Sequence, residues 1–342
     1  MLQRVAAIFN KLSHKPLDVR GGNTAPGAVI QQFDYHGGAN QRWIVKNEVS
    51  GPVVNGAQSA PLFSLSTLGQ AVTVDPSDPT NVRVSQQPLA RTPTFAAAAG
   101  QLWALEELPR SHPFDPRRYV IRNAREGSVL GLKSDSNADG VEVELGTFQN
   151  KDSQRWEILY QLNLQTLGSD DIIVVFNKNS HKCLDVPGST LNDSDVQQFT
   201  YNGGRNQFWS LAPASFPPLQ NRPARMILPV HASGLRALDL KEPSFRQVVQ
   251  RPVSGVNRQA WSIFARPGFP VPDDFMIDNA VGPFFQHSLP GGTATGGSVL
   301  DVVNGTKNNG DAIQIFPPHF GPGQLWEIWV SEAYPDGFSW TT

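Results

Sequence analysis

The side chains that most often carry out catalysis are present in this chain, but their spacing does not assemble an active site. No pair of histidines has a metal-ligand spacing such as His-x-x-x-His. Neither a Gly-x-Ser-x-Gly nucleophile elbow nor a phosphate-binding loop occurs. We therefore expect no catalytic residue, no metal and no cofactor. The seven histidines are His14, His36, His112, His181, His231, His287 and His319.

Three carboxylates stand out because each occupies the middle of a Leu-Asp-Val triplet. They are Asp18, Asp185 and Asp301. Glycoside hydrolysis usually needs two carboxylates, and no second one accompanies Asp18 or Asp185, which argues against an enzyme of that class. Asp also caps loops readily, so these residues could instead be turn formers.

The elements that must position these residues are repeats. A Gln-x-Trp triplet recurs, and successive tryptophans are 52 to 65 residues apart. One aromatic signature at that period is typical of a repeat architecture. The six copies are Gln41/Trp43, Gln101/Trp103, Gln154/Trp156, Gln207/Trp209, Gln259/Trp261 and Gln324/Trp326.

The first repeat resembles the fourth more than it resembles its neighbours. Residues 10–19 and 177–186 are identical at eight of ten positions. A unit of three repeats has therefore been duplicated. We expect a first domain over residues 1–160, a linker over 161–171, and a second domain with a C-terminal tail over 172–342.

The composition favours short strands. Gly and Pro are abundant, at 30 and 28 residues, and only 17% of residues are charged. Three repeats of four short strands can close a small barrel capped by hairpins, which removes free sheet edges. Residues 5–9 read as the first strand and not as a signal peptide.

Charge and cysteine content limit the partners and the compartment. The net charge of −2 and the scattered lysines and arginines predict no nucleic-acid partner. No apolar run is long enough to span a membrane, so we expect no membrane insertion. The single Cys183 excludes an intrachain disulfide and favours a reducing compartment, so we expect a cytoplasmic protein, with later release left open.

Leu-Asp-Val, a Gly-containing loop, Gln-x-Phe and Gly-Gly-x-Asn-Gln-x-Trp together resemble the repeat of ricin B-type (R-type) lectins. The resemblance extends over all six repeats, and the form at residues 33–43 is especially similar to fungal cytosolic members. It implies two tandem β-trefoil domains, and shallow surface pockets for galactose or N-acetylgalactosamine. Glycans would then be the partners, and several sites would gain avidity on clustered glycans. A homodimer stays open.

The resemblance also assigns roles to individual residues. The Asp accepts hydrogen bonds from sugar hydroxyls, the Phe stacks on the sugar ring, and the amides orient it. Repeats one and four are complete, whereas repeat six has Gly323 in place of the Asn. His36 and His319 stand at equivalent places, as a further contact or an alternative stacking face, and Asn202 matches them in repeat four. The full set is Asp18, Gln31, Phe33, His36, Asn40 and Gln41; Asp185, Gln197, Phe199, Asn202, Asn206 and Gln207; Asp301, Gln314, Phe316, His319 and Gln324.

The other three repeats are expected to bind no sugar. Repeat two has Thr73 for the Asp, and repeat three has Gly131 for the Asp and Gly146 for the Phe. Repeat five keeps Asp239, but Arg251 and Arg258 replace the Phe and the Asn, and we expect salt bridges there.

Some roles stay open at this stage. The Gln of each Gln-x-Trp could simply satisfy buried backbone groups, whereas its Trp is expected in the core. Secreted members of the family pair a cysteine at the position of Cys183 with one at the position of Tyr201, so here Cys183 is expected to be a buried apolar residue.

Two other functions remain possible for a β-trefoil. The first is a protease inhibitor that acts through the long segments 90–99 and 264–274. The second is the cell-binding component of a toxin. Fold alone does not separate them from a lectin.

Overall fold

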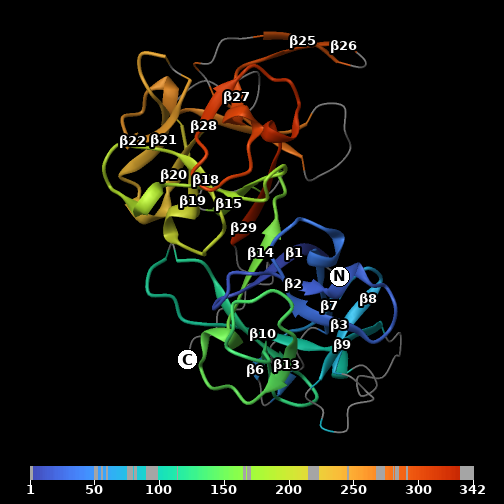
Figure 1. Ribbon diagram of the computed structural model, residues 1–342. Helices are drawn as coiled ribbons and strands as arrows, with labels where there is room; N and C mark the ends of the chain where they lie inside the picture. The colour runs from blue at the N-terminus through green and yellow to red at the C-terminus, as the bar shows by residue number, and fades with distance from the viewer. Residues whose placement is uncertain are drawn as a thin grey trace. The chain divides into compact units, whose positions relative to one another are not determined.

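The computed structural model of the chain consists of β-strands joined by turns and single-turn 3-10 helices (Figure 1). The predicted all-β class is therefore confirmed. No helix among the described residues is long and apolar enough to cross a membrane. The structure describes residues 3–49, 53–54, 57–58, 61–74, 80, 83–89, 99–113, 115–164, 167, 171–214, 223–244, 246–266, 274–279, 281, 285–289 and 292–331.

The first compact unit, formed by described residues within Met1–Ser111 and Arg117–Gln161, contains a closed barrel. Each repeat contributes its first and last strand, and neighbouring strands pair antiparallel around the ring. The last strand pairs back with the first, so the barrel has no free edge. The barrel strands are β1 (Gln3–Asn10), β4 (Trp43–Val49), β7 (Leu62–Thr67), β10 (Trp103–Glu107), β11 (Arg118–Asn123) and β14 (Trp156–Gln161).

The two middle strands of each repeat form a hairpin that caps this barrel. Three such hairpins give the unit its pseudo-threefold β-trefoil architecture, which confirms the predicted fold. The hairpins are β2 (Leu17–Val19) with β3 (Ala28–Gln32), β8 (Gln70–Val74) with β9 (Val84–Pro88), and β12 (Val129–Leu132) with β13 (Val143–Gly146).

The second unit, formed by described residues within Leu162–Val330, repeats this plan. Its barrel closes through the pairing of its last strand with its first. The barrel strands are β15 (Ile172–Asn177), β19 (Trp209–Pro213), β20 (Arg225–Pro229), β23 (Trp261–Ala265), β24 (Phe275–Asn279) and β29 (Trp326–Ser331). The hairpins are β16 (Cys183–Asp185) with β18 (Gln197–Phe199), β21 (Arg236–Leu240) with β22 (Val248–Pro252), and β27 (Val299–Val302) with β28 (Ile313–Phe316).

Further short strands lie outside these two barrels. β17 (Ser194–Asp195) pairs with β22, and two separate hairpins occur. These are β5 (Val53–Val54) with β6 (Ala57–Gln58), and β25 (Phe285–Leu289) with β26 (Gly292–Gly296).

The Trp of every Gln-x-Trp is fully buried, as expected. Each indole Nε1–H donates a hydrogen bond to a hairpin carbonyl in its own repeat, at 2.9–3.2 Å. In the three candidate repeats this carbonyl belongs to Leu17, Leu184 or Leu300, the residue that precedes the Asp. The core therefore fixes the backbone on which each candidate acceptor stands.

Some expectations concern residues that the structure does not describe. They are most of the segments 90–99 and 264–274, part of the linker 161–171, and the tail after Ser331. The predicted domain boundaries therefore stay predictions.

Candidate sugar-binding sites on three hairpins

The register of the hairpins brings acid and amide together. In each candidate repeat the Asp on the second strand is the direct antiparallel partner of the Gln on the third strand. These pairs are Asp18 with Gln31, Asp185 with Gln197, and Asp301 with Gln314. Directly opposed side chains on an antiparallel pair lie on the same face within contact distance. The spacing seen in the sequence therefore corresponds to one repeated geometry.

In repeat one the carboxylate of Asp18 is held from both sides. Gln31 Nε2 donates to its Oδ1 at 3.0 Å, and Asn40 Nδ2 donates to its Oδ2 at 2.7 Å. Asn40 Nδ2 also donates to the carbonyl of Val19 at 3.1 Å. Gln31 is itself oriented by Arg20, whose Nε donates to Gln31 Oε1 at 2.7 Å. The two amide side chains and the acid therefore hold one another in place before any ligand binds.

The aromatic part of this site is a Phe and a His. The Phe33 ring meets the His36 ring edge to face, with centroids 6.2 Å apart. His36 Nε2 lies 3.5 Å from Asp18 Oδ2. Phe33 is 37% exposed, which is unusual for a large apolar side chain and leaves its ring open to a ligand.

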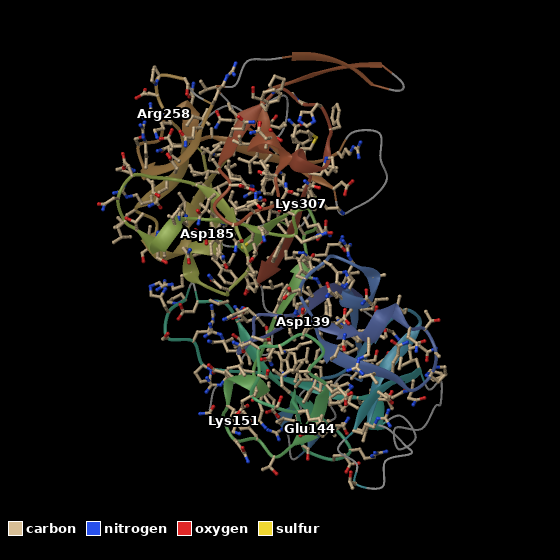
Figure 2. The ribbon with its side chains drawn as sticks, in the orientation of Figure 1. Asp139, Glu144, Lys151, Asp185, Arg258 and Lys307 are labelled. Atoms are coloured by element: carbon tan, nitrogen blue, oxygen red, sulfur yellow. The ribbon has the colours of Figure 1, made fainter. Side chains whose placement is uncertain are left out.

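Repeat four holds its acid through three amide side chains. Asp185 Oδ1 accepts from Gln197 Nε2 at 2.8 Å, and Oδ2 accepts from Asn206 Nδ2 at 2.8 Å and from Gln207 Nε2 at 3.0 Å. Asn206 also donates to the carbonyl of Val186 at 2.9 Å. Figure 2 labels Asp185 on its hairpin. Three amides therefore surround this carboxylate.

Repeat six departs from this pattern because it has no Asn. Gln314 Nε2 donates to Asp301 Oδ2 at 2.9 Å, while His319 Nε2 lies 3.8 Å from Oδ1. A side chain built at Gly323 would approach Asp301 Oδ1 to 3.3 Å, so the glycine leaves one face of the acid open. Phe316 is 38% exposed and meets His319 edge to face, as in repeat one.

Burial raises the pKa of all three acids above the ordinary value of Asp. Asp18, Asp185 and Asp301 are only 2% to 5% exposed. Desolvation penalises the charged form, and the amide donors offset this penalty in part. A carboxylate in such surroundings is a strong acceptor because charge-assisted hydrogen bonds are stronger than neutral ones.

The Gln of Gln-x-Trp fastens the loop that precedes it. Its Oε1 accepts from a backbone N–H in that loop, and its Nε2 donates to a backbone carbonyl. The same two bonds occur at Gln154 and Gln259, in repeats not expected to bind sugar. This residue therefore has a structural role, and in site four Gln207 Nε2 also donates to Asp185 Oδ2 at 3.0 Å.

Repeat five is closed by an ion pair. Arg258 Nε lies 2.7 Å from Asp239 Oδ1, and Gln259 Nε2 donates to Oδ2 at 2.9 Å (Figure 2 labels Arg258). The expected salt bridge is confirmed for Arg258. For Arg251 the expectation of a pairing with Asp239 is wrong, because its guanidinium lies beside Glu242, at 3.7 Å. In repeat two, Thr73 takes the place of the acid and accepts from Gln101 Nε2 at 3.0 Å.

Repeat three has a pocket of about 340 Å³ where the acid and the platform are missing. Gly131 and Gly146 form part of its lining. Gly131 pairs directly with Glu144, so a carboxylate stands on the third strand instead of the second (Figure 2). A second lining carboxylate, Asp135, is satisfied by Ser153 and Lys151.

Sequence reasoning missed His231, which contributes to the electrostatics of site four. It lies in the short helix η7 (Val230–Ala232) of repeat five, and its charge would lower the pKa of Asp185. His231 Nε2 faces the carbonyl of Thr190 at 3.0 Å. Its Nδ1 is buried and has no hydrogen-bond partner among the described residues. No spacing within one repeat could have revealed it, because it comes from the next repeat.

Cys183 is a buried apolar residue, as expected. It is fully buried in β16, and its thiol donates to the carbonyl of Phe199 at 3.3 Å. Burial raises the pKa of the thiol well above its ordinary value. A thiol that resists ionisation and is closed to solvent is unreactive.

Solved structures with some likeness to this chain include several lectins. The Macrolepiota procera ricin B-like lectin in complex with lactose is 18% identical with a TM-score of 0.35, and the match covers 48% of this chain and 97% of that one. The Rhizoctonia solani agglutinin is 21% identical with a TM-score of 0.34, over 46% of this chain and 95% of that one. The C-half of the earthworm R-type lectin in complex with GalNAc is 17% identical with a TM-score of 0.32, over 46% and 99%.

No curated protein matches the chain. The predicted special similarity to fungal members stays a prediction. The model of the ricin-type beta-trefoil lectin domain-like family matches residues 3–63, 99–199 and 152–244. These segments together cover more than half of the chain, which therefore belongs to the ricin-type beta-trefoil lectin domain-like family.

Proposed function

We propose that this protein is a lectin that binds terminal galactose or N-acetylgalactosamine and carries out no chemistry on it. The observation that carries the proposal is the threefold recurrence of one geometry. In repeats one, four and six, an almost fully buried carboxylate lies on the first strand of a hairpin and accepts hydrogen bonds from amide side chains. The second strand of the same hairpin leads to a phenylalanine. Membership of a lectin-like family supports the same function.

The chemistry suits a pyranose with neighbouring hydroxyl groups. Asp18 still has acceptor capacity beyond its bonds from Gln31 and Asn40, because a carboxylate offers about four lone-pair positions. Two vicinal hydroxyls can donate to these positions while the apolar face of the ring stacks on Phe33. The half-exposed ring is already oriented, so little ordering accompanies binding.

Several weak sites on one chain would act together on clustered glycans. A single shallow site buries little of a sugar, so we expect affinity on the millimolar scale, about 4 kcal/mol per site. Two or three sites would increase the apparent affinity for a multivalent surface by about 10²–10⁴-fold. We therefore propose glycoproteins or glycolipids as partners.

A glycan array tests the proposal, with free galactose, N-acetylgalactosamine and glucose as competitors. We expect binding that the first two sugars erase and glucose does not. The matched control is the variant Asp18→Ala/Asp185→Ala/Asp301→Ala, which should give a blank array. A blank array for the unchanged protein, or an array on which glucose competes best, would refute the proposed specificity.

A further inference from the structure

The three candidate sites differ at one residue that contacts the loop of the site. This residue follows the phenylalanine by three positions and is His36 in repeat one, Asn202 in repeat four and His319 in repeat six. In all three sites its side chain accepts a hydrogen bond from the backbone N–H two residues later. The bonds run from Gly38 N to His36 Nδ1 at 3.2 Å, from Gly204 N to Asn202 Oδ1 at 2.9 Å, and from Gly321 N to His319 Nδ1 at 3.1 Å.

This bond fixes the tautomer of both histidines. A neutral imidazole has one donor and one acceptor nitrogen, so Nδ1, as the acceptor, carries no proton. The proton of His36 is therefore on Nε2, which lies 3.5 Å from Asp18 Oδ2. His319 Nε2 likewise lies 3.8 Å from Asp301 Oδ1. Both rings thus direct a neutral N–H towards the acid.

Protonation is incompatible with this arrangement. A proton on Nδ1 would place an N–H donor against the N–H of Gly38, and the bond would be lost. The cationic ring would also be drawn to Asp18, the acceptor that a sugar needs. Asn202 makes the same backbone bond through an amide oxygen, which does not take up a proton at any ordinary pH.

The side chains of His36 and Asn40 lie over Gly38. A Cβ atom placed on Gly38 would lie 2.5 Å from His36 Cε1 and 2.6 Å from Asn40 Oδ1. The imidazole and the amide that donates to Asp18 therefore both lie close to the Cβ position of this glycine.

We propose that sites one and six bind sugar only while their histidine is neutral, whereas site four is independent of this proton. This inference rests on the proposed lectin function and adds regulation to it. The protein would bind through all its sites at neutral pH and through site four alone in a mildly acidic environment. Acidification would thereby remove most of the avidity without unfolding either unit.

Other charged groups also lie near His36 and His319. Around His36 they are Asp18, Asp34 with its partner Lys15 at 2.8 Å, and Arg42, which donates to Gly37. For His319 the structure places Asp301 against the ring. The rings are 41% and 50% exposed, so solvent screens the more distant charges.

Site four also has a histidine, His231, but it does not remove the expected difference in pH dependence between site four and sites one and six. His231 belongs to η7, and burial lowers its pKa below the ordinary value, so it gains a proton only in more acidic solution. The pKa of Asp185 is raised, as are those of Asp18 and Asp301. Protonation of the acids therefore affects all three sites in the same direction and cannot by itself distinguish site four.

The test uses full-length variants in which one site remains active. Asp185→Ala/Asp301→Ala leaves site one, and Asp18→Ala/Asp301→Ala leaves site four. Each is titrated calorimetrically with N-acetylgalactosamine at about pH 7.5 and about pH 5.5. We expect site one to weaken about tenfold and site four to change by less than about twofold.

A reciprocal exchange provides the decisive control. His36→Asn should make site one insensitive to pH, and Asn202→His should make site four sensitive. Equal affinity of site one at both pH values, or a pH dependence that survives His36→Asn, would overturn the inference. If neither single-site variant binds at about pH 7.5 while its melting temperature is unchanged, the proposed lectin function itself fails. The two failures are therefore distinguishable.

Discussion

Exchange of two arginines should open a fourth site in repeat five. This repeat already has Asp239 and Gln259 in the places of Asp185 and Gln207. Arg258 and Arg251 stand where repeat four has Asn206 and Phe199. The double change Arg258→Asn/Arg251→Phe would supply the asparagine amide and the aromatic ring. Val249 stays the direct partner of Asp239 where repeat four has Gln197, so Gln259 provides the second amide.

The cost in stability follows from the ion pair. Asp239 is fully buried, and Arg258→Ala would remove its cation. Removing one partner of a buried pair costs about 3–5 kcal/mol. We expect the lower end, about 3 kcal/mol, because Gln259 Nε2 and the N–H of Leu240 still donate to the acid. For a unit of this size the melting temperature should fall by about 6–12 °C.

Arg258→Asn should cost less than Arg258→Ala. In repeat four the equivalent Asn206 donates both to the acid, at 2.8 Å, and to the carbonyl of Val186, at 2.9 Å. A hydrogen bond to a charged group contributes about 1.5–3 kcal/mol, so the asparagine should recover about half of the loss. The exposed contact between Arg258 and Glu242 adds little to this balance.

Urea unfolding measures the change in stability, and calorimetric titration measures the gain of sugar binding. Binding is tested in the background Asp18→Ala/Asp185→Ala/Asp301→Ala, where no other candidate site remains. We expect N-acetylgalactosamine to bind the variant that also has Arg258→Asn/Arg251→Phe, and not the background alone. Equal destabilisation by Arg258→Ala and Arg258→Asn would refute the view that an amide can replace the guanidinium at Asp239. A stable double variant that binds no sugar would show that acid, asparagine amide and ring do not suffice without the glutamine that pairs with the Asp in the three candidate sites.

Three other predictions concern the sites and the core. Phe33→Ala, in the variant that keeps only site one, should weaken sugar binding by about 1–2 kcal/mol in a titration; an unchanged affinity would move the stacking face to His36. The raised pKa values of Asp18, Asp185 and Asp301 mean that the folded state binds protons more readily than the unfolded state, so these acids lower stability at neutral pH and the loss disappears as the pH falls. The unchanged protein should thus gain unfolding free energy relative to its triple alanine variant between neutral pH and about pH 4, while sugar affinity falls; parallel stability curves would contradict this. Cys183 should resist thiol reagents in the native state and react in urea, and reductant should leave the melting temperature unchanged; rapid native labelling would show that the site opens.

Much of this architecture could be predicted because each repeat shows the same spacing. The distance from Asp18 to Gln31 is the length of a hairpin, so two residues in the sequence became direct partners across β2 and β3. The Trp of Gln-x-Trp is a large apolar residue at a fixed interval, and its burial follows from that alone.

Other features depend on contacts that spacing does not encode. His231 reaches site four from the next repeat, and Arg251 turns to Glu242 instead of Asp239. The pocket in repeat three arises from side chains that are missing at Gly131 and Gly146, and a missing side chain has no periodic signal. The acceptor role of His36 Nδ1 depends on a turn two residues long, which only the folded loop reveals.

The two glycines of the Gly-Gly pair are constrained in different ways. The first, Gly37 or Gly203, has a positive φ, and the same conformation recurs at the matching residue of other repeats, including Asn150 in repeat three and Phe320 in repeat six. The second, Gly38, has a φ of −69°, which any residue can adopt. Gly38 is required only by the side chains packed over it.

The matching residues of the second glycine are glycine only in the three candidate sites. They are Gly204 and Gly321 in repeats four and six, but Lys151 and Val256 in repeats three and five. The backbone at all of these positions is extended. The residue five positions before the Trp therefore separates the three candidate repeats from repeats three and five. In other sequences of this family we expect a glycine at this position to mark repeats that carry a His or Asn side chain over the loop. The Asp does not mark them, because repeat five retains Asp239.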